Sequence, residues 1–285
     1  MRYVKIAVFF VLAVAAGMWL MRPATTDAGG QAQVTETKNS SIFNILLMGC
    51  DASGVRTDSI MLLHVDGADN RVDMLSLPRD SKIYYNGSYH KLNSISALYG
   101  AEAMAQTVEQ LTGVPVDYYV RIYTGGFAQL VDALGGLEYE VEQDMVYSDP
   151  AQDLYINLKK GKQLLSGEQC EQYCRYRSYV MGDLTRTQRQ RKLLTELLRQ
   201  KLKLQYVIKL PALWHILNEN TDTDLSAAEV ISYLPLARSF CEQNVIFVQH
   251  DCPGEYNDMK KERISYYLID RDALKEMCLK SFACE

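Results

Sequence analysis

Short apolar runs and longer periodic segments alternate along the chain from residue 42 onward. Runs of four to eight apolar residues bounded by turn residues are typical of buried strands. The strands predicted in this way are Phe43–Gly49, Ser59–Val65, Val72–Leu77, Tyr118–Tyr123, Leu137–Val141 and Val245–Val248, with a turn at Gly67–Asn70. Strands in this order, separated by helical segments, indicate an α/β sandwich.

The segments between these strands have apolar residues at helical spacing. This spacing predicts helices over Ser94–Thr112 with Gly113 as the C-cap, Phe127–Leu134 closed by Gly135 and Gly136, Ser166 into Arg175 and Arg177, Leu184–Leu204 after an Asp183 N-cap, one near Ser226–Glu229, and one from Arg271. Ser166 and Gln169 have the spacing of a capping box. The fold class predicted is therefore α/β, with a central sheet flanked by helices.

The N-terminus has the pattern of a membrane anchor. Arg2 and Lys5 precede an apolar run over residues 6–21, which Arg22 follows. Basic residues before such a run keep the N-terminus in the cytoplasm and direct the remainder outward. A cleaved signal peptide, with Ala13–Ala15 as the cleavage site, is the alternative. We expect a cytoplasmic tip and single transmembrane helix over 1–22, a linker rich in Thr, Gly, Gln, Ala and Ser over 23–41, and an extracytoplasmic domain over 42–285.

Charge is distributed unevenly along the sequence. The chain has a net charge of -5, which argues against a general nucleic-acid binder. Residues 159–209 nevertheless contain 13 Lys or Arg against 4 Asp or Glu, whereas residues 132–153 contain 7 acidic residues and no basic one. The basic stretch is therefore local, as a binding site would be.

The seven cysteines include no pair with CxxC spacing, so a zinc site is not expected. Buried free thiols are the simplest interpretation for Cys50, Cys170 and Cys174. Two disulfides remain open in an oxidising compartment, Cys241–Cys252 and Cys278–Cys284.

Arginines and acids gather in three separate segments, Asp51–Asp58, Ser76–Asp80 and Arg175–Gln190. Arg79 and Asp51 directly follow predicted strands, where α/β folds place ligands. Arg186, Arg189 and Gln190 share one helix face close to a helix N-terminus, where cations oppose the helix dipole unless an anion is present. The pattern favours a site for a phosphate-rich ligand and a metal ion. Taken singly, each residue also fits a solvated helix face, surface charge or a turn.

These motifs resemble those of the LytR-CpsA-Psr family of extracytoplasmic cell-wall phosphotransferases, from Asn44 to about Phe282. The resemblance is carried by Asn44–Asp51, Arg56–Ser59, Met74–Asp80, Lys91–Asn93, Gly126 and Phe127 with Val131–Gly136, Gly161–Gly167, Arg175–Arg177 and Asp183–Gln190. It implies a mixed central sheet flanked by helices. The cysteines at 50, 170 and 174 depart from the family pattern and leave the motif acids and arginines intact.

The resemblance also implies an activity and roles for residues. Family members transfer a glycan phosphate from a polyprenyl-pyrophosphate-linked donor to peptidoglycan, forming a phosphodiester and releasing polyprenyl phosphate. Asp51 and Asp58 would hold Mg²⁺, with Mn²⁺ as the alternative ion. The pyrophosphate-binding and catalytic residues would be Arg79, Arg175, Arg177, Arg186 and Gln190, with Arg56 near the head group and Asp183 orienting the arginines. The glycan, teichoic acid, capsule or another polymer, is not fixed.

Three other functions use the same residues. A transcription attenuator would read DNA with the helix from Leu184, although an outward-facing domain would never meet DNA. A noncatalytic binder of polyprenyl phosphates would share the site without transferring anything. A pyrophosphatase would pass the phosphoryl group to water instead of peptidoglycan, as a main or a side activity.

Overall fold

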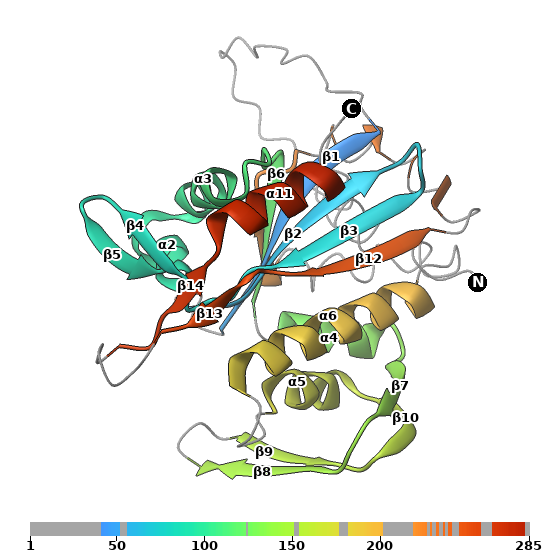
Figure 1. Ribbon diagram of the computed structural model, residues 1–285. Helices are drawn as coiled ribbons and strands as arrows, with labels where there is room; N and C mark the ends of the chain where they lie inside the picture. Colours follow the sequence, from blue (N-terminus) through green and yellow to red (C-terminus); the bar gives the residue numbers. More distant parts are fainter. Residues whose placement is uncertain are drawn as a thin grey trace, which may run out of the picture.

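The computed structural model describes residues 41–51, 56–123, 125–150, 154–176, 182–201, 219–226, 229, 232, 233, 236, 239, 240, 245–257 and 264–282 (Figure 1). Within the helix that starts at residue 182, side chains are described from Gln188 onward. The predicted anchor and almost all of the predicted linker lie outside these residues. No helix in the described ranges is both long and apolar enough to cross a membrane.

A six-stranded mixed sheet forms the centre of the molecule (Figure 1). In spatial order its strands are β11 (Thr221–Thr223), β6 (Tyr118–Tyr123), β1 (Ile42–Cys50), β2 (Thr57–Asp66), β3 (Arg71–Ser76) and β12 (Ile246–Asp251). β6 and β12 run parallel to their neighbours β1 and β3, whereas the β1–β2, β2–β3 and β11–β6 pairs are antiparallel. β1 is buried along almost its whole length, as its continuous apolar run predicts.

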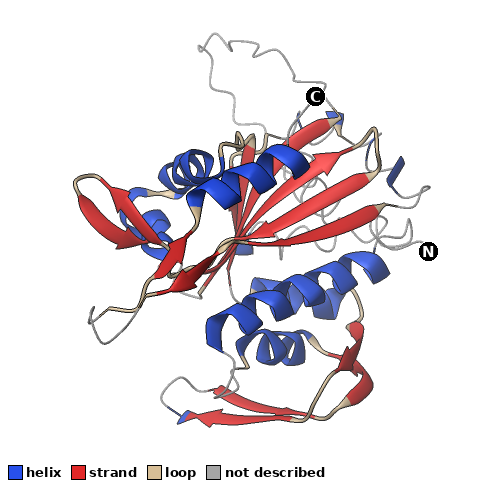
Figure 2. Ribbon diagram, in the orientation of Figure 1, coloured by secondary structure: helices blue, strands red, loops and turns tan. Residues whose placement is uncertain are grey.

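Each face of the sheet packs on its own helices (Figure 2). Leu46 and Met48 of β1 point to one face, against α2 (Leu92–Tyr99), α3 (Ala101–Thr112) and α11 (Arg271–Ser281). Ile45 and Leu47 point to the other face, where Leu194 of α6 (Gly182–Lys201) joins Tyr233 and Phe240. Strand alternation therefore creates two separate cores on one sheet.

A second, smaller layer packs beneath α6 (Figure 1). It contains α4 (Gly126–Ala133), β7 (Leu137–Val141), β8 (Met145–Asp149), β9 (Leu154–Leu158), β10 (Gly161–Leu165) and α5 (Gly167–Arg175), with β7 paired to β10 and β8 to β9. Gly167 is required at the α4–α5 contact, because a Cβ there would lie 1.9 Å from the Ala128 carbonyl oxygen. Leu193 and Leu197 of α6 complete this third core.

Two further hairpins project from the main sheet, β4 (Lys82–Tyr85) with β5 (Ser88–Lys91), and β13 (Gly254–Tyr256) with β14 (Tyr267–Ile269). Our strand prediction omitted both. The sequence of the first hairpin contains a recognisable turn signal, the dipeptide Asn86-Gly87. Both residues adopt positive φ angles, 47° and 83°. Asn-Gly is the preferred dipeptide for such a two-residue turn.

Most predicted elements are confirmed, including the exact bounds of Tyr118–Tyr123 and Leu137–Val141, the left-handed cap at Gly113 and the capping box at Ser166. Three helix boundaries were wrong. The helix predicted over Ser94–Thr112 is two helices, because Gly100 has a φ of 92° that ends α2. α5 ends at Arg175, before Arg177, and α6 begins at Gly182, so Asp183 lies inside the helix and is not its N-cap.

Five cysteines lie in the described part of the chain, and none of them is in a disulfide: Cys50, Cys170, Cys174, Cys252 and Cys278. The prediction of a buried thiol therefore holds for Cys50 and Cys170, whereas Cys174 is only half-buried. Neither Cys252 nor Cys278 forms the disulfide considered for it. Burial raises the pKa of Cys252 and of Cys170 to about 12, as expected for thiols packed in a core.

Candidate functional site

The sheet topology brings two of the predicted segments, Asp51–Asp58 and Ser76–Asp80, to one edge. The end of β1 lies opposite the start of β2, with Cys50 paired to Thr57, and the end of β3 lies beside β2, with Ser76 paired to Met61. Asp51 therefore follows β1 at the same edge at which Arg79 follows β3. Residues almost thirty positions apart in sequence meet because β1 and β3 both run antiparallel to β2.

Asp58 occupies an irregularity in this pairing. Gly49 pairs with Ser59 and Cys50 with Thr57, so Asp58 is the extra residue on β2. Such bulges redirect a side chain and are common beside active sites. The Asp58 carboxylate accepts a hydrogen bond from Nη1 of Arg79, which joins the end of β3 to the start of β2.

Arg79 belongs to a short chain of charges at this edge. Its Nε lies 3.9 Å from the carboxylate of Asp80, and Lys91 Nζ donates to Asp80 Oδ1 at 2.8 Å. The backbone fixes the same loop, since the Arg79 carbonyl accepts from the Asn93 amide at 3.0 Å. The two carboxylates therefore fix the position of the Arg79 guanidinium at the end of β3.

Asp51 and Arg56 bracket the loop between β1 and β2. The Asp51 amide donates to the Arg56 carbonyl at 2.9 Å, and Asp51 Oδ1 accepts from the Arg56 amide at 3.2 Å. Arg56 itself is exposed, so its guanidinium faces solvent beside the edge. Both residues therefore lie at the ends of β1 and β2, and their predicted roles in metal and head-group binding stay predictions.

Arg121 adds a cation that our sequence analysis did not select. It lies on β6 opposite Met48 of β1 and forms an ion pair with Asp222 of β11. Burial raises the pKa of the Cys50 thiol, with the charges of Arg121, Asp51 and Asp58 also acting on it. Cys50 is thus a buried neutral neighbour of the charged edge. The one available signal was a lone arginine within an otherwise apolar strand.

Helix α6 approaches the same edge from below the sheet. Thr195 Oγ1 contacts Met74 of β3, whereas Arg191, one turn earlier, donates to the His250 carbonyl and the Asp251 carboxylate. Asp251 pairs with Ser76, the last residue of β3. Followed from its C-terminus to its N-terminus, α6 therefore runs along β3 toward the loop that contains Arg79.

Gln190 is the predicted α6 residue whose side chain is described. Its Oε1 is buried and has no hydrogen-bond partner among the described residues, and the same holds for Ser76 Oγ. Buried polar atoms are nearly always paired, so each unpaired one marks a place where a ligand or water belongs. This observation supports the placement of Gln190 in a polar site.

Arg189 and Arg175 lie at the junction of α5 and α6. Arg189 Nη1 donates to the Tyr176 carbonyl at 3.2 Å, and its guanidinium lies 5.3 Å from the centre of the Tyr176 ring. Arg189 therefore fixes the chain directly after α5. Arg175 is half-buried and forms an ion pair with Glu171 at 3.4 Å. Arg177 and the side chains of Asp183 and Arg186 lie outside the described residues, so their predicted roles stay predictions.

Sequence comparison provides the family. The model of the LytR_cpsA_psr family matches residues 20–282, nearly all of the chain. The chain belongs to this family. The regulatory protein MsrR of Staphylococcus aureus strain COL is 32% identical over 194 residues, 66% of this chain and 58% of that protein. A Halalkalibacterium halodurans protein named polyisoprenyl-teichoic acid–peptidoglycan teichoic acid transferase TagU is 34% identical over 191 residues, 64% of this chain and 61% of that protein.

Solved structures agree with the LytR_cpsA_psr fold. A protein from Streptococcus agalactiae superimposes with a TM-score of 0.73 at 25% identity, covering 85% of this chain and 88% of that one. TagU of B. subtilis gives a TM-score of 0.64 at 25% identity, covering 86% and 99%. The mixed sheet flanked by helices is therefore confirmed as the family fold. The curated relatives are matched over less than two thirds of their own length.

The donors of the charged edge fit Mg²⁺ better than a transition metal. The described residues include no group of three or more His, Cys, Asp or Glu side chains that could hold a metal. Asp51 and Asp58 offer two carboxylates instead, and Mg²⁺ characteristically uses one or two carboxylates together with substrate phosphates and water. Asp58 also binds Arg79, so cation and guanidinium would share one carboxylate.

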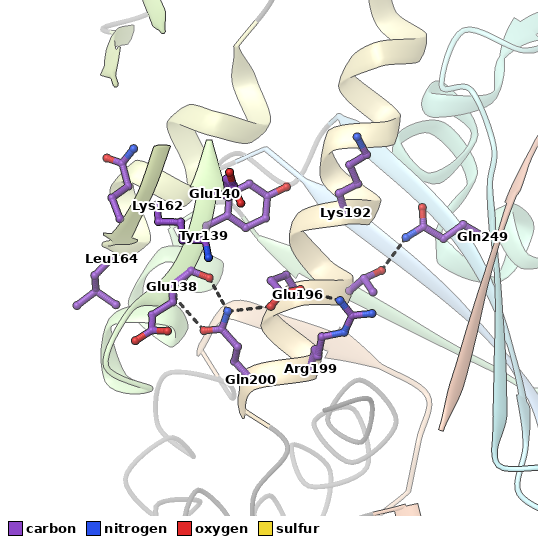
Figure 3. A pocket seen from close by; sticks show the side chains of 12 residues that line it. Glu138, Tyr139, Glu140, Lys162, Leu164, Lys192, Glu196, Arg199, Gln200 and Gln249 are labelled. Carbon is purple, nitrogen blue, oxygen red and sulfur yellow. Dashed lines mark hydrogen bonds and ion pairs between the residues drawn. The ribbon is translucent and has the colours of Figure 1, made fainter. Parts of the chain in front are cut away.

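A groove of about 770 Å³ lies elsewhere, between α6 and the β7–β10 pair (Figure 3). Acidic Glu138, Glu140 and Glu196 line it together with basic Lys162, Lys192 and Arg199. Gln200 spans it, accepting from the Glu138 amide at 3.0 Å. The groove contains none of the predicted site residues, and its mixed charge does not select an anion, so we do not place the pyrophosphate there.

Proposed function

We propose that this protein is a phosphotransferase that moves a polyprenyl-pyrophosphate-linked glycopolymer onto peptidoglycan. The observation that carries the proposal is the Arg79–Asp58 pair beside Asp51 at one edge of the sheet. Phosphoryl transfer requires mainly positioning and neutralisation of charge on non-bridging oxygens. An arginine fork next to two carboxylates suitable for Mg²⁺ provides both.

In the proposed reaction a peptidoglycan hydroxyl attacks the phosphorus that carries the glycan. A new P–O bond forms to peptidoglycan as the bond to the polyprenyl phosphate breaks, and the hydroxyl proton passes to a carboxylate at the edge. Arg79, Arg175, Arg177, Arg186 and Gln190 would bind the pyrophosphate oxygens, Arg56 would lie near the head group, and Asp183 would orient the arginines. Mg²⁺ held by Asp51 and Asp58, or Mn²⁺ in its place, would neutralise phosphate charge.

The compartment is part of this proposal. Basic residues before the apolar run of residues 6–21 favour a cytoplasmic N-terminus and a domain outside the membrane. Peptidoglycan and lipid-linked glycans are available there. The name of the TagU relative describes a teichoic acid transfer to peptidoglycan, which supports a cell-wall polymer as the transferred group.

A regulatory function is less well supported, although the relative MsrR is named a regulatory protein. The helix that would read DNA is α6, and most of its described side chains are buried or half-buried, with Gln188, Lys192 and Arg199 exposed. Leu193, Leu197 and Leu198 are buried, and Arg191 is only 3% exposed. A recognition helix must present a free polar face to the major groove.

The test is a transfer assay with the purified full chain in detergent. A donor with a radiolabelled glycan is incubated with Mg²⁺, with and without peptidoglycan, and label on peptidoglycan and label released to water are counted separately. We expect label on peptidoglycan together with equimolar polyprenyl phosphate. Label released to water alone would indicate a pyrophosphatase, and binding without release would indicate a noncatalytic binder. Either result would overturn the proposal.

A further inference from the structure

The β4–β5 hairpin carries exposed tyrosines that the proposed reaction does not use. Tyr84 and Tyr89 are 60% and 62% exposed, and their ring centres lie 5.2 Å apart. Lys82 lies between the two hairpins, with Nζ 4.9 Å from the centre of the Tyr89 ring and 5.1 Å from that of Tyr266. Leu268, 39% exposed, lies on β14 two residues after Tyr266. We call Lys82, Tyr84, Tyr89, Tyr266 and Leu268 the tyrosine patch.

Strand alternation explains why the tyrosine patch faces outward. Ser81 and Tyr267 form a bridge between the two hairpins, and both are buried. Their neighbours in sequence, Lys82 on one strand and Leu268 on the other, therefore turn to the opposite, solvent-facing side. Figure 1 shows the two hairpins projecting on the same side of the molecule, beyond the helices that cover the sheet.

The hairpin is rooted in the proposed site. The Leu92 amide donates to the Ser81 carbonyl at 2.9 Å, and the Asn93 amide donates to the Arg79 carbonyl at 3.0 Å. Lys91, the last residue of β5, binds Asp80. The tyrosine patch and Arg79 are therefore fixed relative to each other by backbone hydrogen bonds on both sides of the loop.

We propose that the tyrosine patch docks on an anionic membrane surface and thereby brings the Arg79 edge to the head group of a lipid-linked donor. This inference rests on the proposed function. Tyrosine and lysine together are the side chains typical of membrane–water interfaces, where ring and stem are buried and the polar tips stay wet.

Charge and shape favour a membrane over a polysaccharide. Residues 82–99 contain two lysines and no Asp or Glu, although the whole chain has a net charge of -5. Lys91 pairs with Asp80, so the positive charge of the patch is that of Lys82, which complements an anionic lipid surface. Glu255 lies opposite Leu268 across β13–β14 and is exposed, so its carboxylate can stay in water beside the patch. Sugar sites are usually concave, whereas these hairpins project outward.

The test uses the full chain reconstituted in vesicles of phosphatidylglycerol and phosphatidylcholine with brominated acyl chains. Both native tryptophans are first replaced (W19F and W214F), and then Y89W or the matched control Y155W is introduced. Tyr155 is 57% exposed on the β8–β9 hairpin, which lies in the separate layer beneath α6 (Figure 1). We expect brominated lipid to reduce the fluorescence of the Y89W protein by about half or more and to leave the Y155W protein unchanged.

Each other outcome overturns the docking proposal. Equal quenching of both variants, or of neither, means that the patch does not contact lipid preferentially. A change in Y89W fluorescence that requires soluble peptidoglycan fragments instead of brominated lipid means that the patch binds glycan.

A second experiment links docking to transfer. The double variant Y84S/Y89S should transfer about tenfold more slowly from a donor embedded in anionic vesicles, and at the wild-type rate from a water-soluble, short-chain donor. Equal rates of variant and wild type on the vesicle donor would contradict the proposal. If the wild-type chain transfers from neither donor, the proposed function fails while the quenching result stands, so the two failures are distinguishable.

Discussion

Arg79 and Asp58 form an ion pair across two strands of the central sheet, where β3 has just ended and β2 has just begun. The pair exists because β1 and β2 fall out of register by one residue at Asp58. The pair places the Asp58 carboxylate beside Arg79, the arginine that we propose binds the phosphate ligand.

Replacing Arg79 by lysine keeps the charge and removes the planar fork. We expect the transfer rate to fall about 10- to 100-fold, because lysine cannot bind phosphate oxygens in a bidentate manner. The unfolding free energy should change by less than about 1 kcal/mol, since the pair with Asp58 is partly exposed. The control is Arg199→Lys, at an exposed ion pair in the last turn of α6. It should leave the transfer rate and the unfolding free energy unchanged. A wild-type transfer rate in Arg79→Lys would show that the Arg79 guanidinium does not bind the phosphate during transfer.

Replacing Asp51 or Asp58 by asparagine should weaken the binding of the divalent cation. We expect the Mg²⁺ concentration for half-maximal transfer to rise about tenfold or more, because each substitution removes one of two anionic ligands. Binding of Mn²⁺ followed by electron paramagnetic resonance gives a readout independent of turnover. Asp144→Asn changes an exposed carboxylate near β8 and serves as the control. Unaltered Mn²⁺ affinity in both site variants would show that these carboxylates do not hold the ion.

Arg191→Met should destabilise the fold. Arg191 is buried and donates to both the His250 carbonyl and the Asp251 carboxylate, so the variant leaves a partly buried carbonyl without its donor. We expect a loss of about 1 to 3 kcal/mol in urea unfolding. Asp251→Asn should cost less than this, because the Asp251 side chain is 68% exposed. A stability loss in Asp251→Asn equal to that in Arg191→Met would assign the effect to the ion pair instead of the His250 carbonyl.

His64 should make the fold sensitive to mild acid. Its side chain is buried and hydrogen-bonded through Nδ1 to Asn44 Oδ1 at 2.7 Å, and burial lowers the pKa of His64 below its ordinary value of 6.5. The unfolded chain therefore takes up a proton first as the pH falls through 6.5, and stability decreases from there until the lower folded pKa is reached. Each unit of lowering corresponds to about 1.4 kcal/mol.

The measurement for His64 is the unfolding free energy at pH 7.5, 6.5 and 5.5. His64→Gln should flatten the decrease between the first and last values, whereas His90→Gln, at a less buried histidine bonded to Ser88, should keep it. The same decrease in both variants would show that another group causes the acid sensitivity.

The sequence predicted the parts of this molecule that depend on local pattern. Apolar runs located the strands of the central sheet, and the capping box at Ser166 located the start of α5, because both signals arise from neighbouring residues. The positions of Asp51 and Arg79 after strands also followed from the sequence, and the structure adds the ion pair of Arg79 with Asp58.

What was missed depends on contacts between distant segments. Arg121 pairs with Asp222 and Asp73 with His250, separations of 101 and 177 residues that no window of sequence can show. Burial alone would raise the pKa of Asp73, but hydrogen bonds from His250 and Arg71 outweigh it and hold that pKa below its usual value. Gly100 was misread because helical spacing continues through it, whereas its positive φ ends the helix.

The most direct test of the proposed site is the affinity of the full chain for polyprenyl pyrophosphate in detergent, measured by titration calorimetry with Mg²⁺ present. Arg79→Ala should weaken binding by about 100-fold or more, the loss expected for a charge-assisted contact to phosphate at a prepared site. Arg199→Ala should bind as the wild type does. Equal affinity of Arg79→Ala and the wild type would show that the pyrophosphate does not bind at this edge of the sheet.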